Sequence, residues 1–242
     1  MLTVLSGSCL HGSAQDEPSA GGKSKAAPVR KKDPALAPVE DVAGLPRVLL
    51  IGDSISMGYT LPVREKLKGK ANVHRPPVNC GATTTGLENL TAWLDTGGAG
   101  KKWDLIHFNW GLHDLKYLGP DGKTLSDPSD PASKQQVPPD QYRENLQKLV
   151  EQLKATGAIL IWRNTTPVPQ GSAGRAVGDA IVYNGIAQAI MTSAGIPTHD
   201  LYTYALERQK ELQREANVHF TDPGSEALGE EVARVILDAL SR

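Results

Sequence analysis

The chain has 242 residues, 39% of them hydrophobic and 22% charged, so one globular domain of ordinary size is expected. Its 26 basic and 27 acidic residues leave a net charge of −1, which offers no field for a polyanion and argues against a nucleic-acid partner. No apolar run approaches the ~18 residues that cross a bilayer, which excludes an integral membrane segment. The two cysteines are too few for a disulfide scaffold or a Cys-based zinc site, and His74 and His199 lack metal-ligand spacing. We therefore predict no metal and no cofactor.

The first 44 residues show neither helical nor strand periodicity, and we predict a disordered lead at 1–44 before a folded domain at 45–242. Met1 to Leu10 resemble the end of a secretory signal, and small residues up to Ala14 suit a signal peptidase, which predicts a secreted or periplasmic protein. No Lys or Arg precedes the apolar stretch, so the signal is incomplete, and a plain disordered tail is the alternative. Cleavage after Ala14 would remove Cys9 and leave Cys80 as an unpaired, buried thiol.

From Arg47 onward, short β-rich runs alternate with helical patterns, which is typical of a parallel sheet with helices on both faces. The clearest helix is 141–154, whose apolar residues recur at three- and four-residue steps. The last helix follows Asp222, which we expect to cap it. The pattern predicts an α/β, three-layer flavodoxin-like fold with a five-stranded parallel sheet between helices, the strands lying at 48–51, 72–74, 105–109, 158–162 and 197–200.

In open parallel sheets, ligands bind beyond the carboxyl ends of the strands. After the first strand, a glycine-bearing turn delivers Ser54 to the start of a helix, where amide groups and the helix dipole favour negative charge. Glycine-containing polar loops follow the second strand at 79–86 and the third at 111–114. His219 stands just before the last helix and is expected at the same edge. Ser54 is thus a candidate nucleophile, with His219 as its base.

This constellation resembles the SGNH/GDSL hydrolase family from Arg47 to Arg242. The residues 52–54 match the block that carries the nucleophilic serine, and 81–86 are similar to the block whose leading glycine donates a backbone N–H. The residues 111–114 are similar to the Gly-x-Asn-Asp block, and His219 falls where the family places its catalytic histidine. The resemblance implies a serine esterase whose oxyanion is bound by the N–H groups of Ser54 and Gly81 and by the side chain at 113.

Two positions depart from the family pattern. His113 replaces the oxyanion-binding asparagine, and a neutral histidine still has one N–H donor for that purpose. Ala216 stands three residues before His219, where an aspartate normally completes the triad. We expect Glu215 to substitute for it; a backbone carbonyl of 214–217 and Asp200 are the alternatives. Asp53 and Asp114 are assigned to structure, and His107 to the core.

Two long polar loops, at 117–138 and 164–178, are expected to wall the pocket and to favour a small acyl group on a polar substrate. Four residues that follow strands are predicted to contact the substrate: Trp110, Tyr117, Arg163 and Asn164. We therefore predict a carbohydrate O-acetylesterase. A lysophospholipase, thioesterase or aryl esterase of the same family is the first alternative, and a degenerate module that binds a glycan or a protein is the second. The sequence does not indicate an oligomeric state.

Overall fold

The computed structural model describes residues 33–242, and its centre is one parallel sheet of five strands. The strands lie in the order β2-β1-β3-β6-β7, and every neighbouring pair is parallel. Their bounds are Arg47–Ile51 (β1), Asn72–His74 (β2), Leu105–Phe108 (β3), Ile159–Arg163 (β6) and Thr198–His199 (β7). This confirms the predicted flavodoxin-like sheet, with each predicted strand within one residue of the observed bounds.

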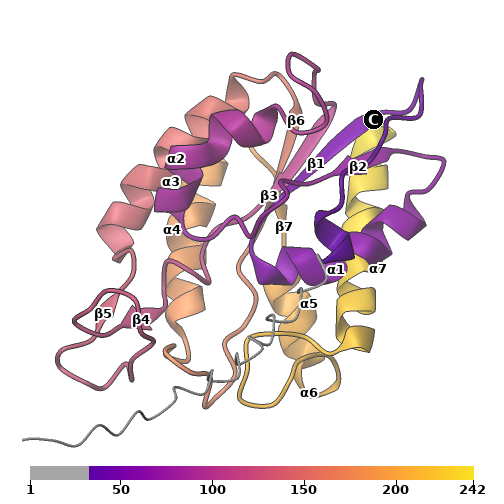
Figure 1. The fold of residues 1–242 in the computed structure, drawn as a ribbon. Coiled ribbons are helices and arrows are strands. Elements are labelled where there is room, and N and C mark those ends of the chain that lie inside the picture. Colours follow the sequence, from indigo (N-terminus) through magenta and orange to yellow (C-terminus); the bar gives the residue numbers. More distant parts are fainter. Residues whose placement is uncertain (1–32) are drawn as a thin grey trace, which may run out of the picture. The chain divides into compact units, whose positions relative to one another are not determined.

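Helices cover both faces of the sheet (Figure 1). α1 (Ser54–Lys66) and α7 (Asp222–Leu240) pack together on one face, and α2 (Thr83–Leu94), α3 (Pro139–Lys154) and α4 (Asp179–Ala194) cover the other. The inner strands β1 and β3 are consequently buried on both faces, which explains their nearly continuous apolar sequences. The short elements are η1 (Pro34–Leu36), the antiparallel pair β4 (Tyr117–Leu118) and β5 (Lys134–Gln135), α5 (Leu201–Glu207) and α6 (Gln209–Leu212).

The start of α7 differs from the prediction. Thr221, not Asp222, is the capping residue, because the Thr221 hydroxyl accepts the Gly224 N–H at 3.0 Å while Asp222 is already helical. Further along α7, Gly229 faces α1, where a built Cβ would collide with the side chain of Pro62. The missing side chain at Gly229 therefore sets how closely the two helices approach each other, and it helps to fix Ser54 and His219 at their starts.

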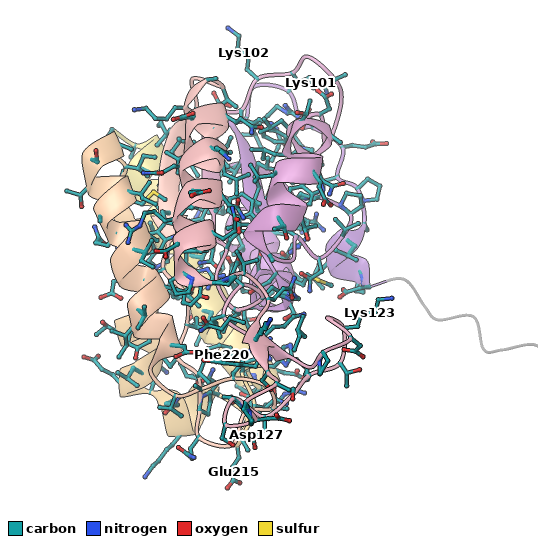
Figure 2. All side chains as sticks on the ribbon, turned by 90° about the vertical axis from the view of Figure 1, so that its left-hand side faces the viewer. Lys101, Lys102, Lys123, Asp127, Glu215 and Phe220 are labelled. Carbon is teal, nitrogen blue, oxygen red and sulfur yellow. The ribbon has the colours of Figure 1, made fainter. Side chains whose placement is uncertain are left out.

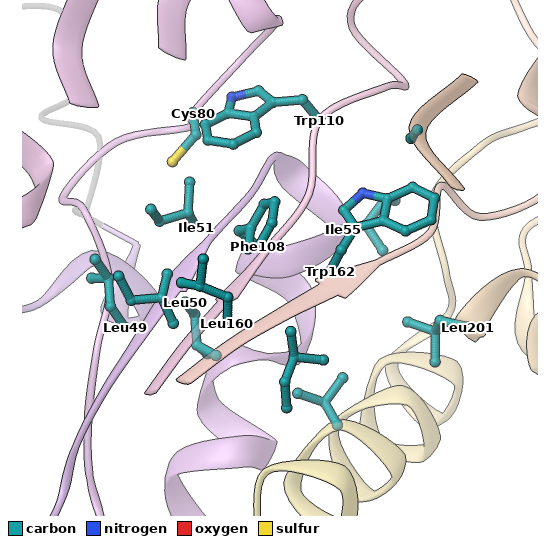
Figure 3. Close-up of a cluster of buried hydrophobic side chains, with 14 of the residues drawn as sticks. Leu49, Leu50, Ile51, Ile55, Cys80, Phe108, Trp110, Leu160, Trp162 and Leu201 are labelled. Carbon is teal, nitrogen blue, oxygen red and sulfur yellow. The ribbon is translucent and has the colours of Figure 1, made fainter. Parts of the chain in front are cut away.

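Large apolar side chains fill the space around the strands (Figure 3). Phe108 and Trp162 are buried between the layers, and Cys80 and Trp110 extend this core towards the carboxyl ends of the strands. Cys80 is a free thiol, as expected, and burial raises its pKa to about 11. His107 is a core residue, as predicted: its Nε2 lies 3.1 Å from Nδ1 of the buried His199.

The segment 33–44, which the sequence assigned to a disordered lead, is part of the compact domain. The Asn72 side chain accepts the Val42 N–H at 2.8 Å and donates to the Val42 carbonyl at 3.0 Å. Asp41 lies 2.6 Å from Nε2 of His74. Buried polar side chains on β2 thus hold this segment against the sheet, a role that local sequence periodicity does not indicate. The signal-like residues, the cleavage after Ala14 and Cys9 lie outside the described residues.

No helix within residues 33–242 combines the length and apolar character needed to cross a membrane.

Candidate active site

Ser54 owes its position to a tight turn between β1 and α1. The Asp53 carboxylate accepts the Ile55 N–H at 3.0 Å and so caps α1, the structural role expected of it. Only glycine fits at position 52 without a steric clash, because a Cβ there would lie 2.8 Å from the Cβ of Ser56. The turn leaves the Ser54 hydroxyl at the first residue of α1, where the helix dipole stabilises negative charge.

The Ser54 Oγ lies 2.9 Å from Nε2 of His219, although 165 residues separate them in the chain. His219 stands on a short loop before α7. The Gln213 side chain stabilises this loop, because its amide group donates to the carbonyls of Pro167 at 2.9 Å and Val218 at 3.0 Å. The structure therefore brings together the serine and the histidine that the sequence paired, within hydrogen-bond distance and from opposite ends of the domain.

Asn217, not Glu215, supports the histidine ring. Asn217 Oδ1 lies 2.9 Å from the His219 backbone nitrogen and 2.8 Å from its Nδ1. Since a backbone N–H can only donate, the amide oxygen must face it, and the same oxygen then requires a hydrogen on Nδ1. Nε2 is left with its lone pair towards Ser54, which is the tautomer that a general base needs. A neutral amide thus provides the orientation usually supplied by an aspartate.

The residues proposed for that role lie elsewhere. Glu215 is exposed and makes no hydrogen bond to His219; Figure 2 shows it at the outer limit of the molecule. Asp200 instead caps α5, accepting the Thr203 N–H at 3.0 Å. Ala216 adopts a left-handed conformation with φ of 49°, which turns the chain so that the next residue reaches the histidine. A sequence signal for Asn217 did exist: asparagine commonly binds the backbone N–H two residues on.

The surroundings of His219 favour its neutral form. Burial lowers the pKa of this imidazole from its usual value near 6.5, the nearby Asp53 carboxylate opposes that change, and the cations of Arg175 and Arg214 reinforce it. A neutral imidazole at pH 7 can accept the Ser54 proton, so both the tautomer and the charge state are those of a base.

Two further predicted oxyanion donors lie on neighbouring loops. Gly81 has φ of 60°, and its N–H donates to the Asn79 side chain at 3.0 Å, so a substrate oxygen would have to replace or share that acceptor. His113 is half-buried and makes no hydrogen bond within residues 33–242. Burial lowers the pKa of His113, so the ring is neutral and carries one N–H for a ligand.

Two buried residues join these loops to the nucleophile turn. Asp114 accepts the Thr83 N–H at 2.8 Å, which ties the His113 loop to the start of α2, and burial raises the pKa of Asp114 to about 7. Arg75, unremarked at the level of sequence, donates to the carbonyls of Gly52 and Val78, each at 3.2 Å. Arg75 thereby links the turn that carries Ser54 to the loop that leads to Gly81.

Burial corrects the predicted substrate contacts of Trp110 and Arg163. Trp110 and Arg163 are both 0% exposed, so neither reaches a substrate. Arg163 Nη2 instead donates to Asn109 Oδ1 at 2.8 Å. This hydrogen bond allows the Arg163 side chain to point into the core rather than towards a substrate. Asn164 is nearly buried and binds Asp200 at 2.6 Å, while Tyr117 lies on β4 and does not line the hollow beside Ser54.

A hollow of about 540 Å³ opens beside Ser54, between the first turns of α1 and α7. Both apolar and charged side chains line it: Ile55, Leu61, Pro62, Phe220, Arg214, Asp222 and Glu226. The two long loops expected to wall the pocket do not line it. Within the described part of the chain, no three His, Cys, Asp or Glu side chains gather closely enough to hold a metal ion.

A parallel α/β sheet that brings a serine hydroxyl within hydrogen-bond distance of a histidine at its carboxyl edge has the groups that acyl transfer requires. The model of the GDSL-like lipase/acylhydrolase family matches residues 50–227, and the chain belongs to that family, which confirms the resemblance found in its sequence motifs. The protein is a carboxylic ester hydrolase.

Solved structures share the fold at low identity. The acetyl xylan esterase AlAXEase is 15% identical with a TM-score of 0.60, over 78% of this chain and 99% of that chain. Axe2, an acetylxylan esterase from Geobacillus stearothermophilus, is 16% identical with a TM-score of 0.61, over 78% and 93%. The lipase/acylhydrolase from Enterococcus faecalis is 19% identical with a TM-score of 0.60, over 79% and 95%. No curated protein matches the chain.

Proposed function

We propose that the protein is a serine esterase that removes small acyl groups, above all acetyl, from a carbohydrate. The observation that carries this proposal is the 2.9 Å contact between Ser54 Oγ and His219 Nε2, with the ring fixed by Asn217. A hydroxyl at a helix start, beside an imidazole that holds a lone pair towards it, is equipped for nucleophilic attack on an ester carbonyl. The same arrangement has no evident use in a module that only binds glycans or proteins.

In the proposed reaction, His219 takes the Ser54 proton as the hydroxyl oxygen attacks the carbonyl carbon. The Ser54 and Gly81 N–H groups and the His113 ring stabilise the oxyanion, each donor being worth ~10² to 10³ in rate. The imidazolium then gives its proton to the leaving alcohol, which leaves an acyl group on Ser54. Water, deprotonated by His219, attacks this acyl-enzyme and releases the acid.

Two features support a small acyl group on a polar alcohol. The hollow beside Ser54 carries the charged side chains of Arg214, Asp222 and Glu226, which favours a polar substrate over a long acyl chain. Two of the structural neighbours are acetyl xylan esterases, which supports the carbohydrate assignment.

We also propose that the protein is exported, because its first residues resemble the end of a secretory signal. Mass analysis of the N-terminus of protein recovered outside the cytoplasm tests this proposal.

The decisive test compares substrates and variants of purified protein. We expect acetate release from acetylated oligosaccharides and from 4-nitrophenyl acetate, with long-chain esters turned over far more slowly, and loss of activity in Ser54→Ala and His219→Ala. A fluorophosphonate probe should label Ser54, as read by mass. Preference for long-chain esters would support a lysophospholipase or thioesterase instead. Failure of the probe to label Ser54 under any condition would favour a binding module.

A further inference from the structure

Arg175 lies near His219 and Asp53, and Lys116 lies near His113 and Asp114. Lys116 and Arg175 are half-buried, and neither forms an ion pair within residues 33–242. By contrast, Arg47 lies 3.1 Å from the Asp41 carboxylate, and Arg234 lies 2.6 Å from the Glu231 carboxylate. The nearest carboxylates already accept other hydrogen bonds, Asp53 from the Ile55 N–H and Asp114 from the Thr83 N–H. The two cations therefore keep donors free for a direct contact with an anionic ligand.

The loop that carries Arg175 lies between the His113 loop and the His219 loop. The Arg175 Nε donates to the carbonyl of Leu112 at 3.2 Å, one residue before His113, and Nη1 donates to the Ala173 carbonyl at 3.2 Å. On its other side, the same loop meets the His219 loop at Gly171, where a built Cβ would lie 3.1 Å from the Cβ of Ala216. Two carbonyls thus orient the guanidinium, while its Nη2 has no hydrogen-bond partner in the described structure.

Lys116 belongs to the same group of charges. The Tyr117 N–H, one residue on, donates to the Gly174 carbonyl at 2.7 Å, which places Lys116 beside the Arg175 loop. Burial lowers the pKa of Lys116, the positive charge of Arg175 lowers it further, and the Asp114 carboxylate opposes both effects. The same two cations lower the pKa of His113, and Arg175 lowers that of His219. The mutual influence of these groups agrees with a positively charged rim that reaches the catalytic pair.

We propose that Lys116 and Arg175 bind a carboxylate of the substrate next to the scissile ester, so that the preferred substrate is an acetylated acidic glycan, such as one built from uronate residues. This inference rests on the proposed esterase function and names its substrate class. The planar guanidinium suits a carboxylate through paired hydrogen bonds, and the ammonium adds a point charge. The hollow beside Ser54 bears Asp222 and Glu226 as well as Arg214, so its side chains do not form a cationic site, and we expect the neutral part of the glycan there.

The experiment compares two substrates that carry the same acetyl group. Acetate release is measured from an O-acetylated oligogalacturonide, which is anionic, and from an acetylated xylo-oligosaccharide, which is neutral, at about 20 mM and about 300 mM salt. We expect kcat/KM to favour the anionic substrate by about tenfold or more at low salt and to approach parity at high salt. Equal rates at both salt concentrations, or a preference for the neutral substrate, would overturn the proposal.

Charge variants locate the effect. Lys116→Gln should reduce the anionic-to-neutral ratio about threefold to tenfold, Arg175→Gln should do the same or more, and Arg175→Lys should retain part of it. Lys102→Gln is the matched control, because this exposed lysine lies at the end of the molecule opposite Phe220 (Figure 2) and should leave the ratio unchanged. An equal loss in Lys102→Gln and Lys116→Gln would assign the preference to overall charge and refute the site.

Two further arms separate this inference from the function on which it rests. If the neutral oligosaccharide and 4-nitrophenyl acetate are hydrolysed in a Ser54-dependent way without any anionic preference, the esterase stands and the carboxylate site fails. Preference for 4-nitrophenyl hemisuccinate over 4-nitrophenyl acetate, with none among the glycans, would place the charge on the acyl group and overturn the acidic-glycan assignment. Thermal unfolding of each variant should match wild type, which excludes loss of folding as the cause.

Discussion

Replacing Asn217 by aspartate is expected to speed ester hydrolysis at alkaline pH. The variant keeps an oxygen at the position 2.8 Å from His219 Nδ1 and places a negative charge on it. A hydrogen bond to a charged group is worth about 1 kcal/mol more than a neutral one, and ~1.4 kcal/mol is a factor of ten in rate. Because the imidazolium forms only as the reaction proceeds, we expect kcat/KM to rise about fivefold to tenfold above about pH 8.

The pH profile makes this prediction specific. One pKa unit corresponds to ~1.4 kcal/mol, so the new charge should raise the pKa of His219 by about one unit from its lowered wild-type value. Only the unprotonated ring acts as a base, so at acid pH the smaller neutral fraction cancels the gain. The two profiles should therefore converge at low pH and separate at high pH, as measured with 4-nitrophenyl acetate from about pH 5 to about pH 9.

Asn217→Ala completes the test. This variant has no acceptor for Nδ1–H, so the tautomer is free and activity should fall by ~10² or more, with little change in thermal stability because the side chain is exposed. Wild-type activity in Asn217→Ala, or an apparent pKa of the kcat/KM profile that is unchanged in Asn217→Asp, would show that the amide does not orient the base.

Three other changes have expected outcomes. His113→Ala should lower kcat by ~10² to 10³ while His113→Asn retains most of it, as steady-state kinetics would show; equal kcat in all three proteins would remove His113 from the oxyanion site. Gly229→Ala should destabilise the fold by ~1 to 3 kcal/mol, because the new methyl group collides with Pro62. Gly185 is helical and has open space around it, so Gly185→Ala should stabilise the fold by ~0.5 to 1 kcal/mol. Chemical denaturation that ranks the two variants in the opposite order would contradict this packing. Burial lowers the pKa of His199 to about 4, below its unfolded value of 6.5, so the unfolded chain takes up a proton first and stability falls as the pH drops through this window. As the pH falls from 6.5 to about 4, the free energy of unfolding of His199→Gln should rise relative to that of wild type by ~1.4 kcal/mol per pH unit. Parallel curves of stability against pH would refute this.

The sheet was predictable because its signal is local. Strands β1 and β3 read as apolar runs since both faces are covered by helices, and α3 carries a periodic stripe from Tyr142 to Leu153 that is buried throughout. Ser54 and His219 could be paired from the sequence because parallel strands bring their carboxyl ends to one edge.

The rest of the site depends on contacts that no local pattern encodes. Arg163 and Trp110 follow the pattern of strand-end residues, yet the structure buries both. The hydrogen-bond acceptor of the buried Arg163, Asn109, directly follows a different strand, β3. Likewise, Glu215 was preferred for its charge, whereas the left-handed turn at Ala216 presents Asn217 to the histidine. The expected partners of His219 were two carboxylates and a backbone carbonyl, whereas the structure uses a side-chain amide that acts through its orientation.

The docking of residues 33–46 beside β2 affects an edge of the sheet that could otherwise pair with another chain. β2 is the last strand on its side of the sheet, and an open strand edge is a template for pairing with another chain. The side chains of Asn72 and His74 bind Val42 and Asp41 of the preceding segment beside that strand. The Arg64 Nε donates to the Val73 carbonyl at 3.1 Å. A chain that begins at β1 would lack this covering segment, so its tendency to aggregate should rise even though every proposed catalytic group remains.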